Sequence, residues 1–329
     1  MNLDIVTIIF DDEMDLNLLR LQALSFQLVN PDIIGNIFIV YNDSKFTDFK
    51  QNIIPVLQND YPIEFRSKLQ FIWSKDLGID TNRPGWFTQQ QAKLLVSCYV
   101  RSECYVVLDA KNHFIRKIEK EAFFSNDAKC KPLLYLSDSG PMISHFLNSL
   151  DYFRTKNSFP DIKNMPTTVT PYIFITIHVR EMLKLIARKE MINIKSLLYK
   201  VFFVRGFNYK NWTSDCLYYL LTKHQDESCT EFYLYAAYLA LKNKLSSHEE
   251  KPVNLSGFCV FKQDPKTHFW NSFEAKDQAL KNEEIKVFGL HRNVIGILDT
   301  AYKRNLLNMY ADFYSNDIVN YIEEKILYN

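Results

Sequence analysis

Short apolar runs alternate with longer amphipathic segments over the first 120 residues, and this alternation restricts the chain to few folds. The apolar runs predict strands at residues 5–10, 36–41, 69–73 and 105–108. The segments between them predict helices at residues 15–28, 46–58 and 87–100. Strands that alternate with helices of this length favour right-handed crossovers and a parallel sheet. The sequence therefore predicts an α/β fold with a mainly parallel sheet and flanking helices.

The pattern becomes more helical after residue 130. Strands are predicted at residues 132–136, 257–261 and 285–289, and a surface loop at residues 244–252. Helices are predicted from residue 141, at residues 171–189, 193–205 and 229–243, and twice between residues 295 and 327. We therefore expect an α/β region at residues 1–130 and a helical elaboration at residues 131–329 that continues the same sheet.

Composition argues against several classes of function. Of the 329 residues, 47% are hydrophobic and 23% are charged, as in ordinary globular proteins. The 8 glycines form neither G-x-G-x-x-G nor G-x-x-x-x-G-K-[ST], so a Rossmann dehydrogenase or a P-loop NTPase is not expected. A net charge of +1 creates no global field that would attract nucleic acid.

The cysteines and the first residues of the chain indicate the cellular compartment that we expect for the protein. The six cysteines form no C-x-x-C pair and no metal spacing, and those in apolar runs, such as Cys104 and Cys259, are expected to be reduced core thiols. Residues 1–4 do not begin an export signal. No uncharged apolar stretch reaches the roughly 18 residues of a spanning helix. We therefore expect a cytoplasmic protein.

Polar side chains follow three of the predicted strands. They are Asp11 and Asp12, Asn42 and Asp43, and Asp109 with Lys111 and Asn112. The carboxyl ends of parallel strands meet at the edge where open α/β sheets bind ligands. A strand-end aspartate alone is most often a turn residue. With Lys111 and Asn112 beside it, Asp109 is predicted to hold a ribose hydroxyl or a divalent cation, and Lys111 to offset phosphate charge.

The predicted helix before Asp109 carries a second group of candidate residues. Trp86, Gln90 and Lys93 recur at spacings of four and three, which places them on one helix face. Gln89 and Lys93 form a further i,i+4 pair. An aromatic ring, amides and an ammonium group near a strand-end carboxylate suit a polar ligand that carries phosphate.

Further candidates lie in the second half of the chain. Glu231 stands at a predicted helix start, where the helix dipole favours an acid, so a capping role and a general-base role are both open. His291 and Arg292 follow a predicted strand, and they are either surface residues or contacts to a phosphate or a metal.

Two other segments leave both a structural and a functional reading open. Thr170, Pro171 and Tyr172 are predicted to open a helix, and they either initiate it or form an acceptor loop. Residues 179–210 carry eight basic side chains against two acidic ones, interleaved with apolar residues. That stretch predicts contact with an anionic membrane surface or a solvated helix face.

Five of these segments, taken in order, resemble those of bacterial surface-polysaccharide glycosyltransferases with a GT-A-like fold. By residue type, residues 85–94 are similar to G-W-[YF]-x-x-Q-Q-x-x-K-L, and residues 108–114 to L-D-[SA]-x-x-x-F. Residues 230–235 are similar to [ST]-E-[YF]-x-x-Y. A T-P pair and a late H-R pair match Thr170-Pro171 and His291-Arg292.

The resemblance implies a nucleotide-sugar donor bound by residues 1–130. The nucleotide would contact the strand-end residues Phe10, Asp11 and Asn42. The ribose and diphosphate would be held by Asp109, Lys111 and Asn112, with His291 and Arg292 at the leaving group. The donor sugar would lie beside Trp86, Gln89, Gln90 and Lys93.

The resemblance also implies an acceptor on the side of residues 131–329. The acceptor would be a growing surface glycan of capsule or lipopolysaccharide type, including lipid-linked forms at the inner membrane face. Thr170, Pro171 and Tyr172 would contact it, and Glu231 would take the proton of its hydroxyl group. Two other classes stay open, a sugar-nucleotide nucleotidyltransferase or hydrolase and a non-catalytic binding scaffold.

One position departs from the family pattern. Enzymes with a GT-A fold commonly carry D-x-D, whose carboxylates hold Mn²⁺ or Mg²⁺ against the diphosphate. Here the second acid is replaced by Lys111. The expectation is therefore either no cofactor or a divalent cation held by Asp109 and His291.

Overall fold

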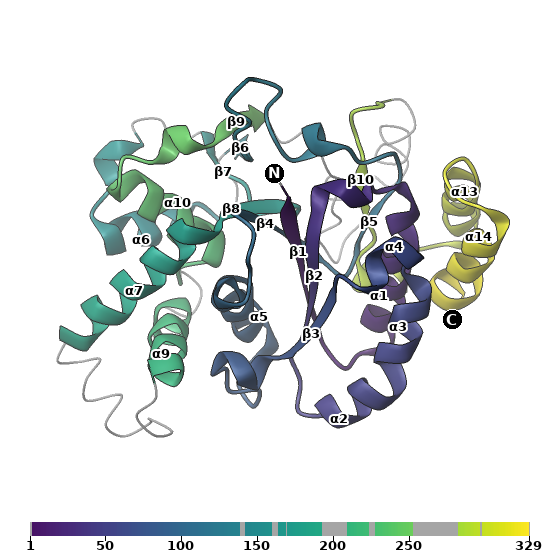
Figure 1. The fold of residues 1–329 in the computed structure, drawn as a ribbon, viewed down its shortest axis with the longest axis horizontal. Coiled ribbons are helices and arrows are strands. Elements are labelled where there is room, and N and C mark those ends of the chain that lie inside the picture. Colours follow the sequence, from purple (N-terminus) through teal and green to yellow (C-terminus); the bar gives the residue numbers. More distant parts are fainter. Residues whose placement is uncertain are drawn as a thin grey trace.

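A five-stranded sheet forms the centre of the computed structural model (Figure 1), with the strand order β3-β2-β1-β4-β8. β1 (Leu3–Ile9), β2 (Ile34–Tyr41), β3 (Leu69–Trp73) and β4 (Cys104–Asp109) are parallel, and β8 (Tyr172–Ile175) runs antiparallel to β4. The structure describes residues 2–138, 142–159, 164–168, 170–192, 209–223, 228–252, 282–296 and 298–328. The predicted α/β fold with a mainly parallel sheet and flanking helices is confirmed.

The remaining elements surround this sheet. The helices of the first half are α1 (Glu13–Ser25), α2 (Phe46–Asp48), α3 (Ile54–Asp60), α4 (Ile63–Arg66) and α5 (Gly85–Leu95). Those of the second half are α6 (Ile143–Phe153), α7 (Thr176–Ile192), α9 (Tyr209–Thr222), α10 (Glu231–Leu241), α12 (Arg292–Ile295), α13 (Thr300–Ala311) and α14 (Asn316–Ile322). The shorter strands are β5 (Asn112–Phe114), β6 (Leu133–Asp138), β7 (Asn164–Pro166), β9 (Glu249–Pro252) and β10 (Val287–Gly289).

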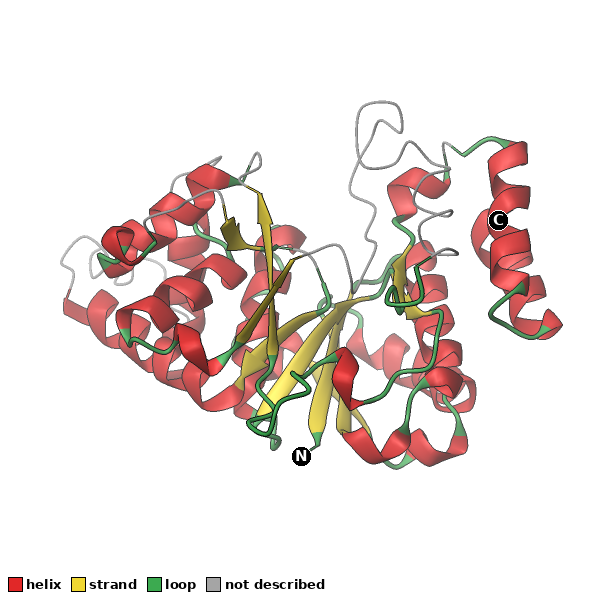
Figure 2. Cartoon of the chain, turned by 90° about the horizontal axis from the view of Figure 1, so that it is seen from above, coloured by secondary structure: helices red, strands yellow, loops and turns green. Residues whose placement is uncertain are grey.

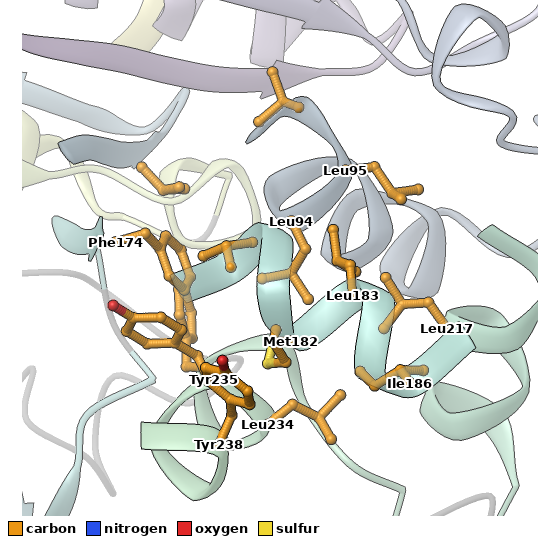
Figure 3. Close-up of a cluster of buried hydrophobic side chains, with 14 of the residues drawn as sticks. Leu94, Leu95, Phe174, Met182, Leu183, Ile186, Leu217, Leu234, Tyr235 and Tyr238 are labelled. Atoms are coloured by element: carbon orange, nitrogen blue, oxygen red, sulfur yellow. The ribbon is translucent and has the colours of Figure 1, made fainter. Parts of the chain in front are cut away.

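The sheet is covered on both faces, which explains why its strands are almost continuously apolar (Figure 2). Alternate residues of β4 join two different cores. Tyr105 and Val107 pack into the core shared with α5, α7, α9 and α10 (Figure 3), whereas Val106 and Leu108 join the core shared with α1 and α3. The last residue of β4, Asp109, is thereby delivered to the edge of the sheet.

Two sequence predictions in the second half are wrong. The helix predicted from residue 171 begins at Thr176, because residues 172–175 form β8 and pair with β4. A short apolar run fits a buried strand or a buried helix equally well by periodicity, and the pairing decides here. Residues 244–252 are not simply a loop, since β9 pairs in parallel with β6 as an edge strand. Its charged sequence gives no strand signal of its own.

Other elements differ in detail. The helix predicted at residues 46–58 is interrupted by a π-helical segment at Phe49–Ile53. β5, β7 and α9 were not expected from the sequence. The helix predicted at residues 193–205 and the strand predicted at residues 257–261 lie outside the described residues. Within the part of the chain that is described, no helix has the length and apolar character needed to cross a bilayer.

The C-terminal helices lie against the first helix of the chain, on the right of Figure 1. Leu306 and Ile322 share a buried cluster with Leu18 and Leu21 of α1. β10 pairs antiparallel with β5, which is joined to Asp109 by the short turn at Ala110 and Lys111. Residues from both ends of the chain therefore pack near the end of β4, where Asp109 lies. The division of the chain at residue 130 stays a prediction.

This arrangement buries His113 of β5, and we expect the burial to make stability depend on pH. His113 Nε2 lies 3.0 Å from the Tyr310 hydroxyl, and burial lowers the pKa of His113 to about 3. Below the unfolded pKa of about 6.5, the unfolded chain binds a proton that the folded protein does not. His113 therefore contributes stability above that pH, and the contribution is lost as pH falls toward 3.

Urea denaturation between pH 7 and pH 4 measures this contribution. The free energy of unfolding should fall with decreasing pH, and His113→Gln should make the slope shallower by about 1.4 kcal/mol per pH unit. An unchanged slope in His113→Gln would show that His113 takes up its proton in the folded protein.

Candidate active site

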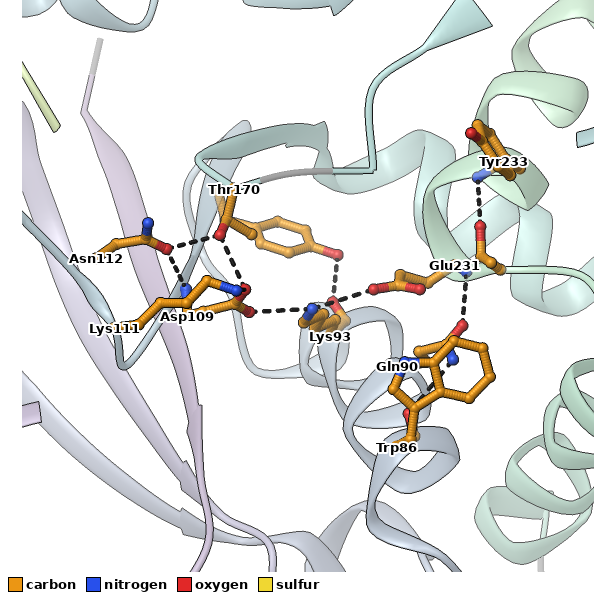
Figure 4. Close-up of polar contacts among 11 residues, drawn as sticks. Trp86, Gln90, Lys93, Asp109, Lys111, Asn112, Thr170, Glu231 and Tyr233 are labelled. Atoms are coloured by element: carbon orange, nitrogen blue, oxygen red, sulfur yellow. Dashed lines mark hydrogen bonds and ion pairs between the residues drawn. The ribbon is translucent and has the colours of Figure 1, made fainter. Parts of the chain in front are cut away.

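Asp109 stands at the centre of a buried network of charged side chains (Figure 4). Its Oδ2 lies 2.9 Å from Lys111 Nζ, and its Oδ1 lies 3.2 Å from Lys93 Nζ. The side chain of Asp109 is 23% exposed, against 10% for Lys111 and 7% for Lys93. A ligand would therefore meet this network at the carboxylate.

A tight turn between β4 and β5 fixes the position of Asp109. The Asp109 amide donates a hydrogen bond of 2.9 Å to Asn112 Oδ1. The Thr170 hydroxyl lies 2.6 Å from the same oxygen and 3.0 Å from Asp109 Oδ2. Gln22 of α1 donates to the carbonyls of both Asp109 and Asn112, at 3.0 Å and 2.9 Å. Asn112 is fully buried and holds the turn, and its contact with a ligand stays a prediction.

Lys93 links the strand end to Glu231 at the start of α10. Lys93 Nζ lies 3.1 Å from Glu231 Oε1, and the side chains are 7% and 5% exposed. The Thr230 hydroxyl caps α10 by accepting from the Tyr233 amide at 3.4 Å. Gln90 Oε1 accepts from the Glu231 amide at 3.3 Å. Gln90 and Lys93 thus lie on one face of α5, as their spacing predicts, and both bind the start of α10.

Burial and ion pairing shift the two carboxyl groups in opposite directions. Burial raises the pKa of Asp109, but Lys111 and Lys93 outweigh it and hold that pKa well below its usual range. Burial also raises the pKa of Glu231, and there Lys93 offsets only part of the effect. The pKa of Lys93 lies above its usual value, because Asp109 and Glu231 outweigh its burial. Carboxyl groups whose pKa values are driven apart suit different chemical roles.

The ends of β1 and β2 meet the start of α5. The ring of Phe10 lies against Gly85, where an added Cβ would be only 2.9 Å from the ring. Asn42 is buried, and its Nδ2 donates to the Thr88 hydroxyl at 2.8 Å. Asp11 pairs with Lys45 at 3.1 Å on the surface. Of the predicted nucleotide contacts, Phe10 and Asn42 therefore lie against α5, and Asn42 is already bonded to it.

The two other predicted residues of α5 are more accessible. Trp86 is 45% exposed, and its carbonyl accepts from Gln90 Nε2 at 3.3 Å. Gln89 is half-buried beside it. Trp86 thus presents an exposed ring about one helical turn from the buried network.

His291 and Arg292 lie beside Lys111, because the Leu290 amide donates to the Lys111 carbonyl at 3.0 Å. Burial lowers the pKa of His291 to about 4, and Lys111 and Arg292 add to the effect. Arg292 NH1 lies 2.6 Å from Asp15 Oδ2 and 3.3 Å from Asp12 Oδ2. Arg292 would have to leave Asp15 of α1 and Asp12, the N-cap of that helix, to bind a phosphate.

The three predicted acceptor residues do not form one contact surface. Thr170 bonds to the turn at Asp109, and Pro171 follows it through a cis peptide bond. Tyr172 begins β8, is 2% exposed and stacks on Phe232 with ring centroids 4.3 Å apart. The segment opens a strand rather than a helix, and of its two side chains with hydroxyl groups only that of Thr170 bonds to Asp109.

Sequence reasoning missed Gln22, which is buried on the core face of α1. Its Oε1 accepts from the Thr7 hydroxyl at 2.8 Å, while its amide group holds the Asp109 turn. The available signal was a glutamine within the apolar face that contains Leu18, Leu19 and Leu21. A polar side chain at such a position needs buried hydrogen-bond partners.

The donor set at Asp109 does not fit a divalent cation. Ammonium groups contact both of its carboxylate oxygens, and neither group can ligate a metal. His291 Nδ1 accepts from the Asn293 amide at 3.1 Å. Across the described residues, no three His, Cys, Asp or Glu side chains are grouped to hold a metal ion.

The fold and the site together define a class: an α/β protein with a buried, alternating network of carboxylates and ammonium groups at the carboxyl edge of its sheet. By sequence, residues 10–280 match a protein family described as a family of unknown function, DUF6492. The chain belongs to this family. No curated protein matches it significantly.

Three solved structures that resemble the chain are glycosyltransferases, each with a TM-score of 0.42. Xyloside xylosyltransferase 1 from mouse is 8% identical, with 88% of this chain and 98% of that chain covered. The bifunctional glycosyltransferase WbbM is 9% identical, with 97% and 51% covered. The galactosyltransferase LgtC, solved with donor and acceptor sugar analogues, is 10% identical, with 98% and 100% covered.

Proposed function

We propose that this protein is a glycosyltransferase that moves a sugar from a nucleotide-sugar donor to a hydroxyl group of a glycan. The observation that carries the proposal is the chain of contacts from Lys111 through Asp109 and Lys93 to Glu231. It supports the proposal because it connects Lys111, whose ammonium group can pair with a diphosphate, to Glu231, a carboxylate with a raised pKa. Stabilising the leaving nucleoside diphosphate and removing the proton of the acceptor hydroxyl are the two tasks that such a transfer requires.

Lys111 is the proposed partner of the leaving diphosphate. When the bond between the anomeric carbon and the phosphate oxygen breaks, negative charge develops on the nucleoside diphosphate. Ammonium groups already fixed at the site stabilise that charge without reorganisation. The reaction proposed here therefore uses protein cations where many related folds use a metal ion, with His291 and Arg292 at the edge of the same site.

Glu231 is the proposed general base. Lys93 binds its Oε1, and we assign Oε2 to the acceptor. The acceptor oxygen attacks the anomeric carbon, its proton passes to Oε2, and the nucleoside diphosphate leaves with the electron pair of the broken bond. A carboxylate whose pKa is raised by burial is a stronger base than one in water. The exposed ring of Trp86 would support a sugar at the entrance of the site.

The test of the proposal is to measure nucleoside diphosphate release from candidate sugar nucleotides with and without glycan acceptors. Acceptor-dependent release with a new glycosidic product supports transfer. Release of sugar phosphate or nucleoside monophosphate without an acceptor would instead identify a nucleotidyltransferase or hydrolase. Donor binding without turnover across a broad acceptor set would identify a non-catalytic binding scaffold.

The acceptor we propose is a growing surface glycan, of capsule or lipopolysaccharide type, carried by a lipid. The support lies on α7, where one exposed stripe is formed by Ile177, Glu181, Lys184, Arg188 and Met191, and its one acid, Glu181, is paired with Lys244. Ile177 and Met191 are 53% and 55% exposed, and the two cations lie between them. Cations flanked by apolar side chains complement an anionic lipid surface. The rest of the basic stretch, at residues 193–208, lies outside the described residues.

Reversing the charge of this stripe should weaken membrane binding. The double variant Lys184→Glu/Arg188→Glu is expected to reduce binding to anionic vesicles at least about tenfold, because each cation near such a surface is worth about 1 kcal/mol. Co-sedimentation with vesicles measures the effect, and Lys117→Glu, whose side chain is 78% exposed, is the matched control. Equal losses in both variants, or no binding by the unchanged protein, would refute the lipid contact.

A further inference from the structure

Lys93 lies between the two carboxylates of the site and is almost fully buried. Its Nζ is 3.2 Å from Asp109 Oδ1 and 3.1 Å from Glu231 Oε1. The Phe232 ring lies beside it, with its centroid 5.1 Å from Nζ. The sequence suggests that Lys93 contacts the donor sugar, but two of its three N–H groups already serve these carboxylates. Its position therefore favours an indirect role, in which Lys93 acts on the reaction through the carboxylates of Asp109 and Glu231.

The two carboxylates depend on Lys93 to different degrees. Asp109 has a second ammonium group, that of Lys111, at 2.9 Å. Within the described residues, Lys93 supplies the one ion pair of Glu231. Removing the charge of Lys93 therefore leaves Asp109 paired and Glu231 buried without a counter-charge. An isolated buried carboxylate responds to that loss by taking up a proton.

We propose that Lys93 is a positioning residue for the transfer, whose ammonium group keeps Glu231 anionic and fixes its carboxyl group relative to Asp109. This inference rests on the proposed function, since it assigns the base role to Glu231. The two ammonium groups then have different roles: Lys111 pairs with the donor diphosphate, and Lys93 acts on the acceptor side through Glu231.

The surroundings of Glu231 support this assignment. The charged or titratable groups that face it come from three neighbouring elements: Lys93 of α5, Asp109 of β4 and Tyr172 of β8. Groups of the other packed helices bond elsewhere on α10 or before it. His145 of α6 bonds to the Ser228 carbonyl, and Glu181 of α7 to the Tyr238 hydroxyl. Lys93 is therefore the cation that sets the charge state of Glu231.

Lys93→Met is expected to move the acidic limb of the pH–rate profile upward by about 1–3 pH units, because an opposite charge within contact distance lowers a carboxyl pKa by about that much. Activity at pH 7 should fall more than about tenfold and recover in part at higher pH. Donor affinity should stay within about twofold, since Lys111 still pairs with Asp109. Lys93→Arg, which keeps the charge, should retain the position of the limb.

The experiment measures pH–rate profiles and donor affinity for the unchanged protein, Lys93→Met, Lys93→Arg and Lys111→Met. Lys111→Met is the matched control, because it also removes an ammonium group bound to Asp109 but not one bound to Glu231. The inference is overturned if Lys93→Met keeps the limb of the unchanged protein, or if it loses donor affinity as Lys111→Met does. Should Lys93→Met fail to fold, a shifted limb in Lys93→Arg would overturn the inference equally.

A second measurement separates this inference from the proposed function. Lys93→Met should lower the melting temperature, and the double variant Lys93→Met/Glu231→Gln should melt higher than Lys93→Met, because it removes the uncompensated buried charge. If the unchanged protein transfers no sugar but this rescue occurs, the pairing holds and the proposed function fails. If transfer occurs without the rescue, the proposed function stands and the role of Lys93 fails.

Discussion

Replacement of Glu231 by glutamine is expected to slow sugar transfer by about 10²–10⁴-fold and to leave donor affinity unchanged, because a positioned general base typically contributes that much. Glutamine has nearly the same shape as glutamate and keeps an oxygen for Lys93, but it cannot take the acceptor proton. Glu231 also contacts neither Lys111 nor the Asp109 turn directly, so the donor side should remain intact.

The measurement is single-turnover transfer with saturating donor, combined with a donor titration. Glu181→Gln is the matched control, since Glu181 of α7 is a more exposed carboxylate that bonds to Tyr238 of α10 and to Lys244, which follows α10. That control should retain normal rates. A Glu231→Gln enzyme that transfers sugar as fast as the unchanged protein would remove Glu231 as the base.

The second large effect concerns the donor. Lys111→Met should weaken donor binding by about 10–100-fold, because a hydrogen bond to a charged group is worth about 1.5–3 kcal/mol. Asp109 would keep Lys93 at 3.2 Å, so the carboxylate stays paired and the strand end stays in place. The loss should therefore appear in the dissociation constant of the donor and not in the stability of the fold.

Calorimetric titration of the nucleoside diphosphate measures this loss. Lys45→Met is the control, because Lys45 is a surface cation at the same sheet edge, paired with Asp11 and 63% exposed. Its removal should alter the affinity little, since pairs of exposed charges contribute little. An unchanged dissociation constant in Lys111→Met would refute the phosphate role of Lys111.

The parallel part of the sheet could be predicted from the sequence, and the antiparallel and edge strands could not. β1 to β4 are long apolar runs separated by helices, so local pattern alone identifies them. β8 is a run of four residues that only its pairing with β4 distinguishes from a helix. β9 consists of charged residues and proline, and its strand conformation comes from β6. Pairing with a distant strand has no signature in the segment itself.

In the candidate active site, too, local features could be predicted from the sequence and long-range contacts could not. Helical spacing predicts that Gln90 and Lys93 share a face, and a strand end predicts the place of Asp109. The contact of Lys93 with Glu231 spans 138 residues of sequence, so no local pattern reveals it. The pairing of Arg292 with Asp12 and Asp15 likewise joins opposite ends of the chain. Long-range contacts decide which charged side chains are free for a ligand and which bind one another.

The most direct test of the account is a thermal-shift panel of UDP, GDP, CMP and dTDP, each measured with EDTA and with Mn²⁺. A ligand at 100 times its dissociation constant stabilises the fold by about 2.7 kcal/mol, which raises the melting temperature measurably. We predict that one nucleotide stabilises the protein in EDTA, and that Lys111→Met, by weakening binding about 10–100-fold, reduces the stabilisation at the same nucleotide concentration to about 0.4–1.4 kcal/mol. No shift with any nucleotide, or a shift that requires Mn²⁺, would contradict it.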